Sequence, residues 1–308
     1  MVELSIVIPM RNEAAGLPAL FARLTPCIAQ VTTQYEIICV DDGSTDATYL
    51  ALKELHRSDS RIKAVHLARN FGKEVALTAG IDYASGQAVI PLDADLQDPP
   101  EIIPHMVEQW KKGFKMVLAT RKSRPGDSWL KRKSAEWFYK IMNSLSTVKL
   151  PPDTGDFRLM DRIVIEAVKQ LPERTRFMKG IFAWVGFPTA TVYFDREPRQ
   201  AGITNWNYWN LWKFALDGIF SFTSLPLRVW TYVGAVISLI SFLWAFRIII
   251  STMVFGNPVA GYPSLMVAVC FMGGMQLLSI GIIGEYVGRI YTESKHRPLY
   301  LVEETLGI

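Results

Sequence analysis

Short apolar runs alternate with helical patterns through the N-terminal part of the chain. Four apolar runs have the length of buried strands, at residues 4–9, 36–40, 63–67 and 88–92. Three segments between them show helical spacing, at residues 17–28, 46–57 and 72–84. Ser44 or Thr45 is expected to cap the second of these helices. This order predicts an α/β domain with a mostly parallel sheet, whose ligand site lies at the carboxyl ends of the strands.

Two long stretches without charge follow late in the chain. Residues 229–246 and 265–284 contain no Asp, Glu, Lys or Arg. Each stretch is about long enough to cross a hydrocarbon core of roughly 30 Å as a helix. We therefore expect two transmembrane helices, near 229–254 and 264–286. Arg247 fits least well, and we expect it to extend toward the membrane surface or to face a neighbouring helix.

Basic residues lie outside the two uncharged stretches and are absent between them. Arg228 precedes the first stretch, Arg289 and Lys295 follow the second, and the connecting residues 256–263 carry no charge. The N-terminal residues turn polar too early for a signal peptide. Because cytoplasmic loops are enriched in Lys and Arg, both ends of the chain and its N-terminal domain are expected on the cytoplasmic side.

Composition excludes several classes of protein. The formal net charge is only +4, and the three cysteines and four histidines show neither a disulfide framework nor zinc-binding spacing. The glycines match neither the dinucleotide-binding fingerprint nor a phosphate-binding P-loop. A soluble dehydrogenase is therefore disfavoured, and no nucleic-acid partner is expected.

Carboxylates follow directly after the second predicted strand, in the run Asp41-Asp42-Gly43-Ser44-Thr45-Asp46. Carboxylates at a strand end can accept hydrogen bonds from a nucleotide base or ribose. The alternative is that they stabilise the N-terminus of the following helix. Both interpretations stay open for Asp46, whereas ligand contact is favoured for Asp42.

The fourth predicted strand also ends in oxygen-bearing side chains. Asp93, Asp95 and Gln97 alternate along the loop that follows it. Such oxygens suit a hard divalent cation, Mg²⁺ or Mn²⁺, which would stabilise a departing diphosphate. An Asp-x-Asp pair also occurs by chance in surface loops, but its position after an apolar strand favours the metal interpretation.

Two segments have the pattern of helices that lie in a membrane surface. Residues 128–145 place apolar side chains on roughly one side of a helix and basic side chains elsewhere. Residues 205–226 form the second candidate, with Trp206, Trp209 and Trp212 recurring at every third position. Core packing is the alternative for both segments. Gly284-Glu-Tyr-Val-Gly288 permits close helix contact, and we expect a homo-oligomer.

Four motifs together resemble glycosyltransferase family 2 with the GT-A fold: Ile6–Glu13, Asp41–Asp46, Asp93–Pro99 and Thr154–Leu159. Three further motifs and the paired C-terminal stretches narrow the resemblance to transferases that act on a polyprenyl phosphate: Arg69–Glu74, Glu136–Lys140 and Phe177–Ile181. The resemblance implies a multi-pass protein of the bacterial inner membrane with a cytoplasmic catalytic domain.

The resemblance also implies roles for individual residues. Asp156 and Asp95 would be the catalytic carboxylates, with a simple ion pair between Asp156 and Arg158 as the alternative. The nucleotide-sugar pocket would be lined by Pro9, Arg11, Glu13, Asp42 and Asp93. The metal ligands would be Asp93, Asp95 and Gln97, and the phosphate-binding residues Arg121, Arg132 and Arg199. Asn205 departs from the Lys that relatives carry.

The implied reaction is transfer of a hexose, glucose from UDP-glucose, to undecaprenyl phosphate with inversion, for O-antigen or cell-envelope glycosylation. The domains would be a catalytic domain at 1–204, an interfacial helix at 205–226, a two-helix membrane region at 227–290 and a cytoplasmic tail at 291–308. Alternatives are a transferase for another UDP-sugar, a processive polysaccharide synthase, which normally carries a Gln-x-x-Arg-Trp motif absent here, and a non-catalytic scaffold of a lipid-sugar flippase system.

Overall fold

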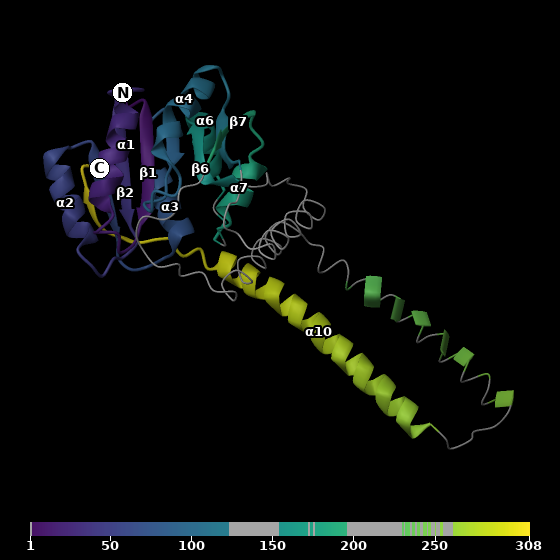
Figure 1. The fold of residues 1–308 in the computed structure, drawn as a ribbon. Helices are drawn as coiled ribbons and strands as arrows, with labels where there is room; N and C mark the ends of the chain where they lie inside the picture. Colours follow the sequence, from purple (N-terminus) through teal and green to yellow (C-terminus); the bar gives the residue numbers. More distant parts are fainter. Residues whose placement is uncertain are drawn as a thin grey trace. The chain divides into compact units, whose positions relative to one another are not determined.

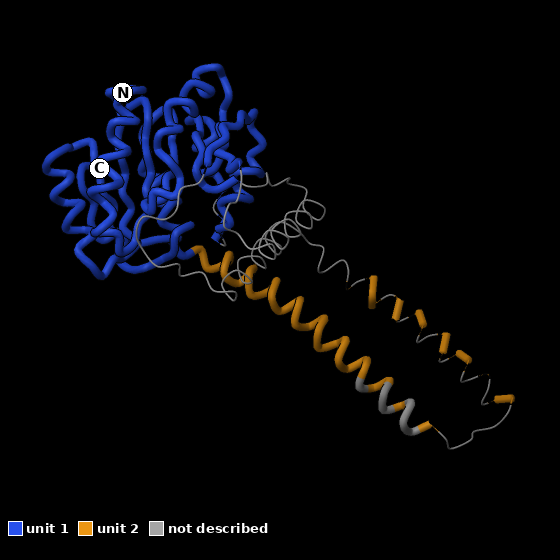
Figure 2. The backbone as a smooth tube through the Cα atoms, in the orientation of Figure 1, with its two compact units in different colours: residues 1–218, 297–308 blue, residues 219–296 orange. Residues whose placement is uncertain are grey.

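The protein is described by a computed structural model that divides into two compact units, residues 1–218 with 297–308, and residues 219–296 (Figure 2). The described residues are 2–122, 154–171, 173–174, 176–195, scattered positions between 230 and 254, and 261–308. The predicted surface helices at 128–145 and 205–226 lie outside them. The predicted domain boundaries remain a prediction.

The first unit is built on one mixed sheet with the strand order β7-β5-β6-β4-β1-β2-β3-β8 (Figure 1). Its strands in chain order are Leu4–Met10 (β1), Tyr35–Asp41 (β2), Ile62–Leu67 (β3), Ala88–Pro91 (β4), Met116–Arg121 (β5), Thr154–Asp161 (β6), Thr189–Phe194 (β7) and Val302–Leu306 (β8). Strand β1 pairs in parallel with β2 and β4, and β2 with β3. Strand β6 is antiparallel to β4 and β5, and β8 is antiparallel to β3. The predicted α/β class and parallel sheet centre are confirmed.

The helices of the first unit follow the predicted rhythm. They are Leu17–Ala29 (α1), Thr48–Ser58 (α2), Lys73–Tyr83 (α3), the short helix Pro100–Ile102 (η1), Ile103–Lys111 (α4), Arg162–Lys169 (α6) and Met178–Trp184 (α7). Helix α2 begins later than expected: its N-cap is Ala47, and neither Ser44 nor Thr45 caps it. Asp46 accepts instead from the backbone N–H of Thr48 at 3.0 Å.

The central strands are buried on both faces, which explains why they read as continuous apolar runs. On one face, Ile6 and Ile8 of β1 join the core formed with α1 and α4. On the opposite face, α3 approaches so closely that a Cβ on Gly80 would lie 2.2 Å from Val7 Cγ1. This packing fixes α3, and with it the loop that precedes α3, against β1 and β2.

The second unit contains helix α10, which runs from Tyr262 to Ser294. A membrane crossing needs about 20 predominantly apolar residues in a row within one helix. No helix in the described part of the chain combines the required length with the required apolarity. The prediction of two transmembrane helices, near 229–254 and 264–286, is therefore wrong, and so is the multi-pass inner-membrane localisation that depended on it.

Candidate functional site

The candidate site lies at the carboxyl ends of β1, β2 and β4. Because these strands are parallel neighbours, the loops that follow them leave the same edge of the sheet. The backbone N–H of Asp42 donates to Met10 O at 2.9 Å, which ties the first two loops together. The predicted residues Pro9, Arg11, Glu13, Asp42, Asp93, Asp95 and Gln97 lie at the ends of these strands or in these loops.

A lysine that was not predicted as a site residue connects the predicted carboxylates. The ammonium of Lys73, at the start of α3, lies 2.7 Å from Asp93 Oδ1 and 3.0 Å from Asp156 Oδ2. Strand β6 runs antiparallel to β4 and β5, so its beginning, which carries Asp156, lies at the carboxyl edge of the parallel strands. The fold therefore places Asp93 of the predicted metal-binding loop and the predicted catalytic carboxylate Asp156 in contact with the same lysine ammonium.

The charges around Asp156 set its protonation state. Although burial raises the pKa of Asp156, the ammonium groups of Lys73 and Lys179 hold it at about 2. Its Oδ1 is buried and has no hydrogen-bond partner among the residues that the structure describes. Arg158, the alternative partner of Asp156, donates from its guanidinium to Gly155 O at 2.6 Å, and its charge also lowers the pKa of Asp156. At neutral pH the site therefore presents an ionised carboxylate with one oxygen unused.

Glu74 is a second buried carboxyl group beside Asp156. Burial and the negative charge of Asp156 raise the pKa of Glu74 to about 8, against the opposing effect of Lys73 and Lys179. Within the described part of the chain, its buried Oε2 has no hydrogen-bond partner. Two neighbouring carboxyl groups thus differ in charge at neutral pH, with Glu74 protonated and Asp156 ionised. The Arg69–Glu74 motif indicated that this segment matters. The spacing of residues within it did not predict that Lys73 and Glu74 lie near Asp156.

The loop after β4 carries the predicted metal ligands in a strained conformation. Asp95 Oδ1 accepts from the backbone N–H of Gln97 at 3.2 Å. Leu96, between them, has φ +56° with its side chain buried, a conformation that costs roughly 1–2 kcal/mol for an L-residue. Within the described ranges, no group of three or more His, Cys, Asp or Glu side chains is placed to hold a metal ion.

Both carboxylate oxygens of Asp42 accept hydrogen bonds from the protein backbone. Its Oδ1 accepts from the N–H of Phe71 at 2.6 Å, and its Oδ2 accepts from the N–H of Gly72 at 2.9 Å. These bonds hold the loop immediately before Lys73 and Glu74. Nucleotide contact by Asp42 stays a prediction, and its bonds show that it orders the loop that leads into α3.

The other predicted residues are more dispersed. Pro9 is buried within β1, whereas Arg11 is exposed in the loop that follows. The backbone N–H of Glu13 donates to Thr48 Oγ1 at 2.9 Å. Arg121 ends β5, where its guanidinium lies 3.8 Å from Asp98 Oδ1. Arg132, Arg199 and Asn205 lie outside the described residues.

Comparison with known proteins identifies the family to which these motifs belong. Residues 5–169 match the family described as glycosyl transferase family 2, and residues 225–290 match the family described as the GtrB C-terminal hairpin. The chain belongs to glycosyl transferase family 2. The expected family, its GT-A fold and the glycosyltransferase class are therefore confirmed.

Several known proteins are similar to this protein over nearly its whole length. An uncharacterized glycosyltransferase from Synechocystis is 59% identical over 307 residues, covering 100% of this chain and 96% of its own. The bactoprenol glucosyl transferase of Shigella phage SfV is 52% identical over 301 residues, covering 98% of each chain. Among solved structures, glucosyl-3-phosphoglycerate synthase from Mycobacterium tuberculosis, in complex with Mn²⁺, UDP-glucose and phosphoglyceric acid, is 18% identical over 70% of this chain and 76% of its own, with a TM-score of 0.47.

Proposed function

We propose that the protein transfers glucose from UDP-glucose to bactoprenol (undecaprenyl) phosphate with inversion at the anomeric carbon. The observation that carries the proposal is the Lys73 bridge, which brings Asp93 and Asp156 together at the carboxyl edge of the sheet. The choice of glucose and bactoprenol is supported by relatives of that name at about half identity over the full chain.

The chemistry of the acceptor fits the ionic character of this site. A phosphate monoester has a second pKa of about 6, so its oxygen is largely ionised at neutral pH and needs no strong base. In the proposed step this oxygen attacks C1 of glucose while the bond from C1 to the UDP oxygen breaks, and the bonding electrons leave with UDP. Asp156, held ionised, would orient the sugar and stabilise positive charge that develops at C1.

The loop after β4 has the donor chemistry for a divalent cation. Asp93 already attracts a cation, the Lys73 ammonium, and Asp95 and Gln97 add a carboxylate and an amide oxygen. Hard cations such as Mg²⁺ and Mn²⁺ prefer such oxygen ligands. When bound, the cation would act as a Lewis acid toward the leaving diphosphate. Arg121, at the end of β5 and 3.8 Å from Asp98, would meet a phosphate group of the donor or acceptor.

The proposed product has a sugar attached to a lipid that resides in a bilayer. The active site must therefore reach the surface of a membrane to receive the acceptor, which makes the bilayer a partner of the enzyme. A glucosyl phospholipid is suited to O-antigen or other cell-envelope glycosylation. Formation of a homo-oligomer remains a prediction from the Gly284–Gly288 spacing.

The proposal is tested by incubating purified protein with undecaprenyl phosphate and radiolabelled UDP-glucose, then extracting the lipid phase. We expect label in a lipid whose mass equals that of undecaprenyl phosphate plus one hexose. Chelation by EDTA should abolish transfer, and added Mn²⁺ or Mg²⁺ should restore it. Parallel reactions with UDP-galactose and UDP-N-acetylglucosamine test the sugar. Label that stays in the aqueous phase under all conditions, with folded protein, would refute the proposal.

A further inference from the structure

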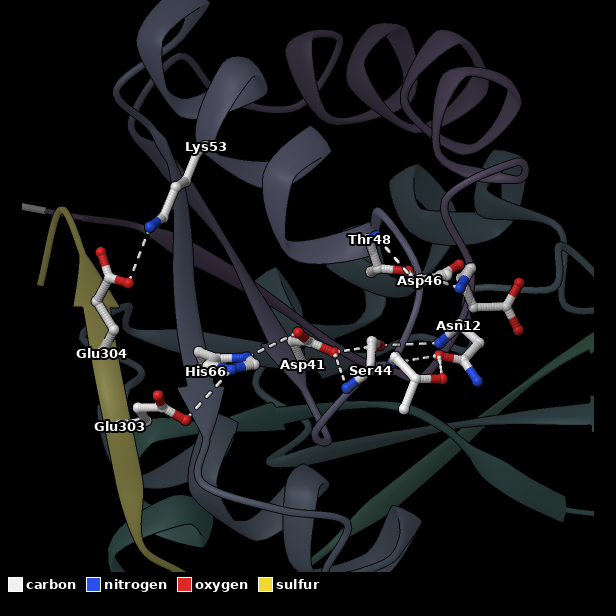
Figure 3. A network of polar contacts seen from close by, with 11 residues as sticks. Asn12, Asp41, Ser44, Asp46, Thr48, Lys53, His66, Glu303 and Glu304 are labelled. Carbon is white, nitrogen blue, oxygen red and sulfur yellow. Dashed lines mark hydrogen bonds and ion pairs between the residues drawn. The ribbon is translucent and has the colours of Figure 1, made fainter.

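A chain of polar contacts crosses the sheet edge from the C-terminal strand to the loops at the candidate site (Figure 3). It starts at Glu303 of β8, passes through His66 of β3 and Asp41 of β2, and ends in the loop after β1. These contacts do not involve Lys73, Asp93 or Asp156. No role in the site was predicted for His66 or for the residues of β8.

His66 is the central member of this chain of contacts. Its Nδ1 lies 2.8 Å from Asp41 Oδ2, and its Nε2 lies 3.6 Å from Glu303 Oε2. Its ring stacks on Tyr49 of α2, with centroids 4.3 Å apart and an interplanar angle of 20°. Because the Asp41 carboxylate acts as acceptor, Nδ1 is the donor in this contact. The imidazole is thus held in one orientation by two carboxylates and an aromatic ring.

Asp41 connects His66 to Ser44, in the loop after β2. Its carboxylate is fully buried, and Oδ1 accepts from both the backbone N–H, at 3.1 Å, and the hydroxyl of Ser44. The Ser44 hydroxyl oxygen in turn accepts from the backbone N–H of Asn12 at 2.9 Å. Each donor and acceptor in this sequence therefore has a fixed direction, from Asn12 through Ser44 to Asp41 and from His66 to Asp41.

Asn12 adopts a left-handed backbone conformation, which asparagine tolerates better than most non-glycine residues. Its φ is +56°, in the left-handed region that non-glycine residues rarely adopt. Its side-chain Oδ1 accepts from the backbone N–H of Thr45 at 2.8 Å. The residues on either side of it, Arg11 and Glu13, are predicted to line the nucleotide pocket. The direction in which these two side chains leave the backbone therefore depends on the bonds that hold Asn12.

We propose that His66 is a positioning residue for the nucleotide pocket, acting through Asp41 and Ser44 on the Arg11–Glu13 loop. Strand β8 covers the edge of β3 and supplies the second carboxylate that faces His66. The inference rests on the proposed function, because it assumes that this pocket binds UDP. It predicts that loss of the His66 hydrogen bond weakens nucleotide binding without disabling the sugar-transfer step.

The test compares two substitutions at His66 in the full-length protein. His66→Phe keeps the ring that stacks on Tyr49 but removes the Nδ1 donor. His66→Asn places a side-chain N–H close to the position of Nδ1 and should retain the bond to Asp41. UDP affinity is measured by calorimetry, and kcat and KM for UDP-glucose are measured by lipid labelling. The matched control is Lys53→Met, which breaks the 2.9 Å contact between α2 and Glu304 of β8 but leaves His66 intact.

For His66→Phe we expect the Kd for UDP and the KM for UDP-glucose to rise about tenfold, the scale of a lost hydrogen bond to a charged group, with little change in kcat. His66→Asn should restore affinity to within about threefold of wild type, and Lys53→Met should not alter it. Unchanged UDP affinity in His66→Phe, whether or not its melting temperature falls, would overturn the inference alone. Failure of folded wild-type protein to bind UDP would overturn the proposed function and this inference with it.

Discussion

The ammonium of Lys73 lies 3.0 Å from Asp156 Oδ2 and joins the first turn of α3 to the beginning of β6. Asp156 is largely buried, with 11% of its side chain exposed, whereas 44% of the Lys73 side chain is exposed. The same ammonium also contacts Asp93. Burial disfavours the charged lysine, but the two carboxylates outweigh it and raise the pKa of Lys73 above its usual range. A permanent positive charge therefore separates two carboxylates that would otherwise repel each other.

Replacement of Lys73 by Met should remove this separation. Without the ammonium, the negative charges of Asp93 and Asp156 repel each other, and both side chains can leave their positions. We expect kcat for lipid glucosylation to fall at least about 100-fold, the scale seen when one preorganised electrostatic group is removed. The measurement is the initial rate of label transfer at saturating UDP-glucose.

Lys115→Met provides the matched control for this substitution. Lys115 forms a similar pair, with its ammonium 3.2 Å from Asp161 Oδ2, but Asp161 is at the end of β6 rather than at its beginning. Its loss should leave kcat within about twofold, because partly exposed ion pairs contribute little. Equal losses of activity in both variants would show that Lys73 has only a general structural role.

Glu74 should make stability depend on pH in a specific direction. Its pKa is about 8 in the folded protein, well above the ordinary value of 4.5. A raised carboxyl pKa stabilises the fold below pH of about 4.5, and this stabilisation is lost as pH rises toward 8, because the unfolded chain releases its proton first. Glu74→Gln is neutral at every pH, and at about 1.4 kcal/mol per pKa unit it should be more stable than wild type by about 4 kcal/mol near pH 8.

The check is the denaturant midpoint of both proteins across this range. The two midpoints should converge below pH of about 4, where wild-type Glu74 is mostly protonated in both states. The nearby groups Asp156, Lys73 and Lys179 are the same in both proteins, so their own titration cancels to first order. A constant difference between the two midpoints at all pH values would contradict a raised Glu74 pKa.

Gly43, in the loop after β2, lies close to the backbone of Arg69 and Asn70 in the loop that leads into α3. Its φ is +61°, and a Cβ there would lie 2.5 Å from the carbonyl carbon of Arg69. Gly43→Ala should therefore lower the free energy of unfolding by at least about 2 kcal/mol, from backbone strain and steric overlap together. Gly113→Ala is the control, because Gly113 has φ +103° but open space around it. Similar losses in the two variants, measured by chemical denaturation, would remove the close approach as a cause.

Local sequence pattern predicted the centre of the fold because the central strands are continuous apolar runs, and α1 and α2 place their apolar residues on one face. The strands from β1 to β4 and the helices from α1 to α3 follow the expected order. Strand β8 was assigned to a tail. Its pairing with β3 joins the C-terminal segment of the first unit to strand β3, and such long-range pairing leaves no local period in the sequence. The two uncharged C-terminal stretches predicted membrane crossings that the described helices do not support.

The residues of the candidate site that belong to sequence motifs could be predicted. The residues whose contacts come from distant parts of the chain could not. Asp42, Asp93 and Asp156 were recognised from their motifs, and the structure places them at one edge of the sheet. Lys73 was missed as a partner because its contacts come from β4 and β6, far away in the sequence. His66 was missed for the same reason, since its partners Asp41 and Glu303 belong to different strands.

The most direct test of the account measures binding and transfer on the same preparation of wild-type protein and the Asp156→Asn variant. Asn has nearly the same shape as Asp but lacks the charge that the site holds ionised. The account predicts that Asp156→Asn binds UDP-glucose within about threefold of wild type, while its rate of label transfer to undecaprenyl phosphate falls at least about 1,000-fold. Transfer by Asp156→Asn at a rate close to that of wild type would contradict the assignment of the reaction to this site.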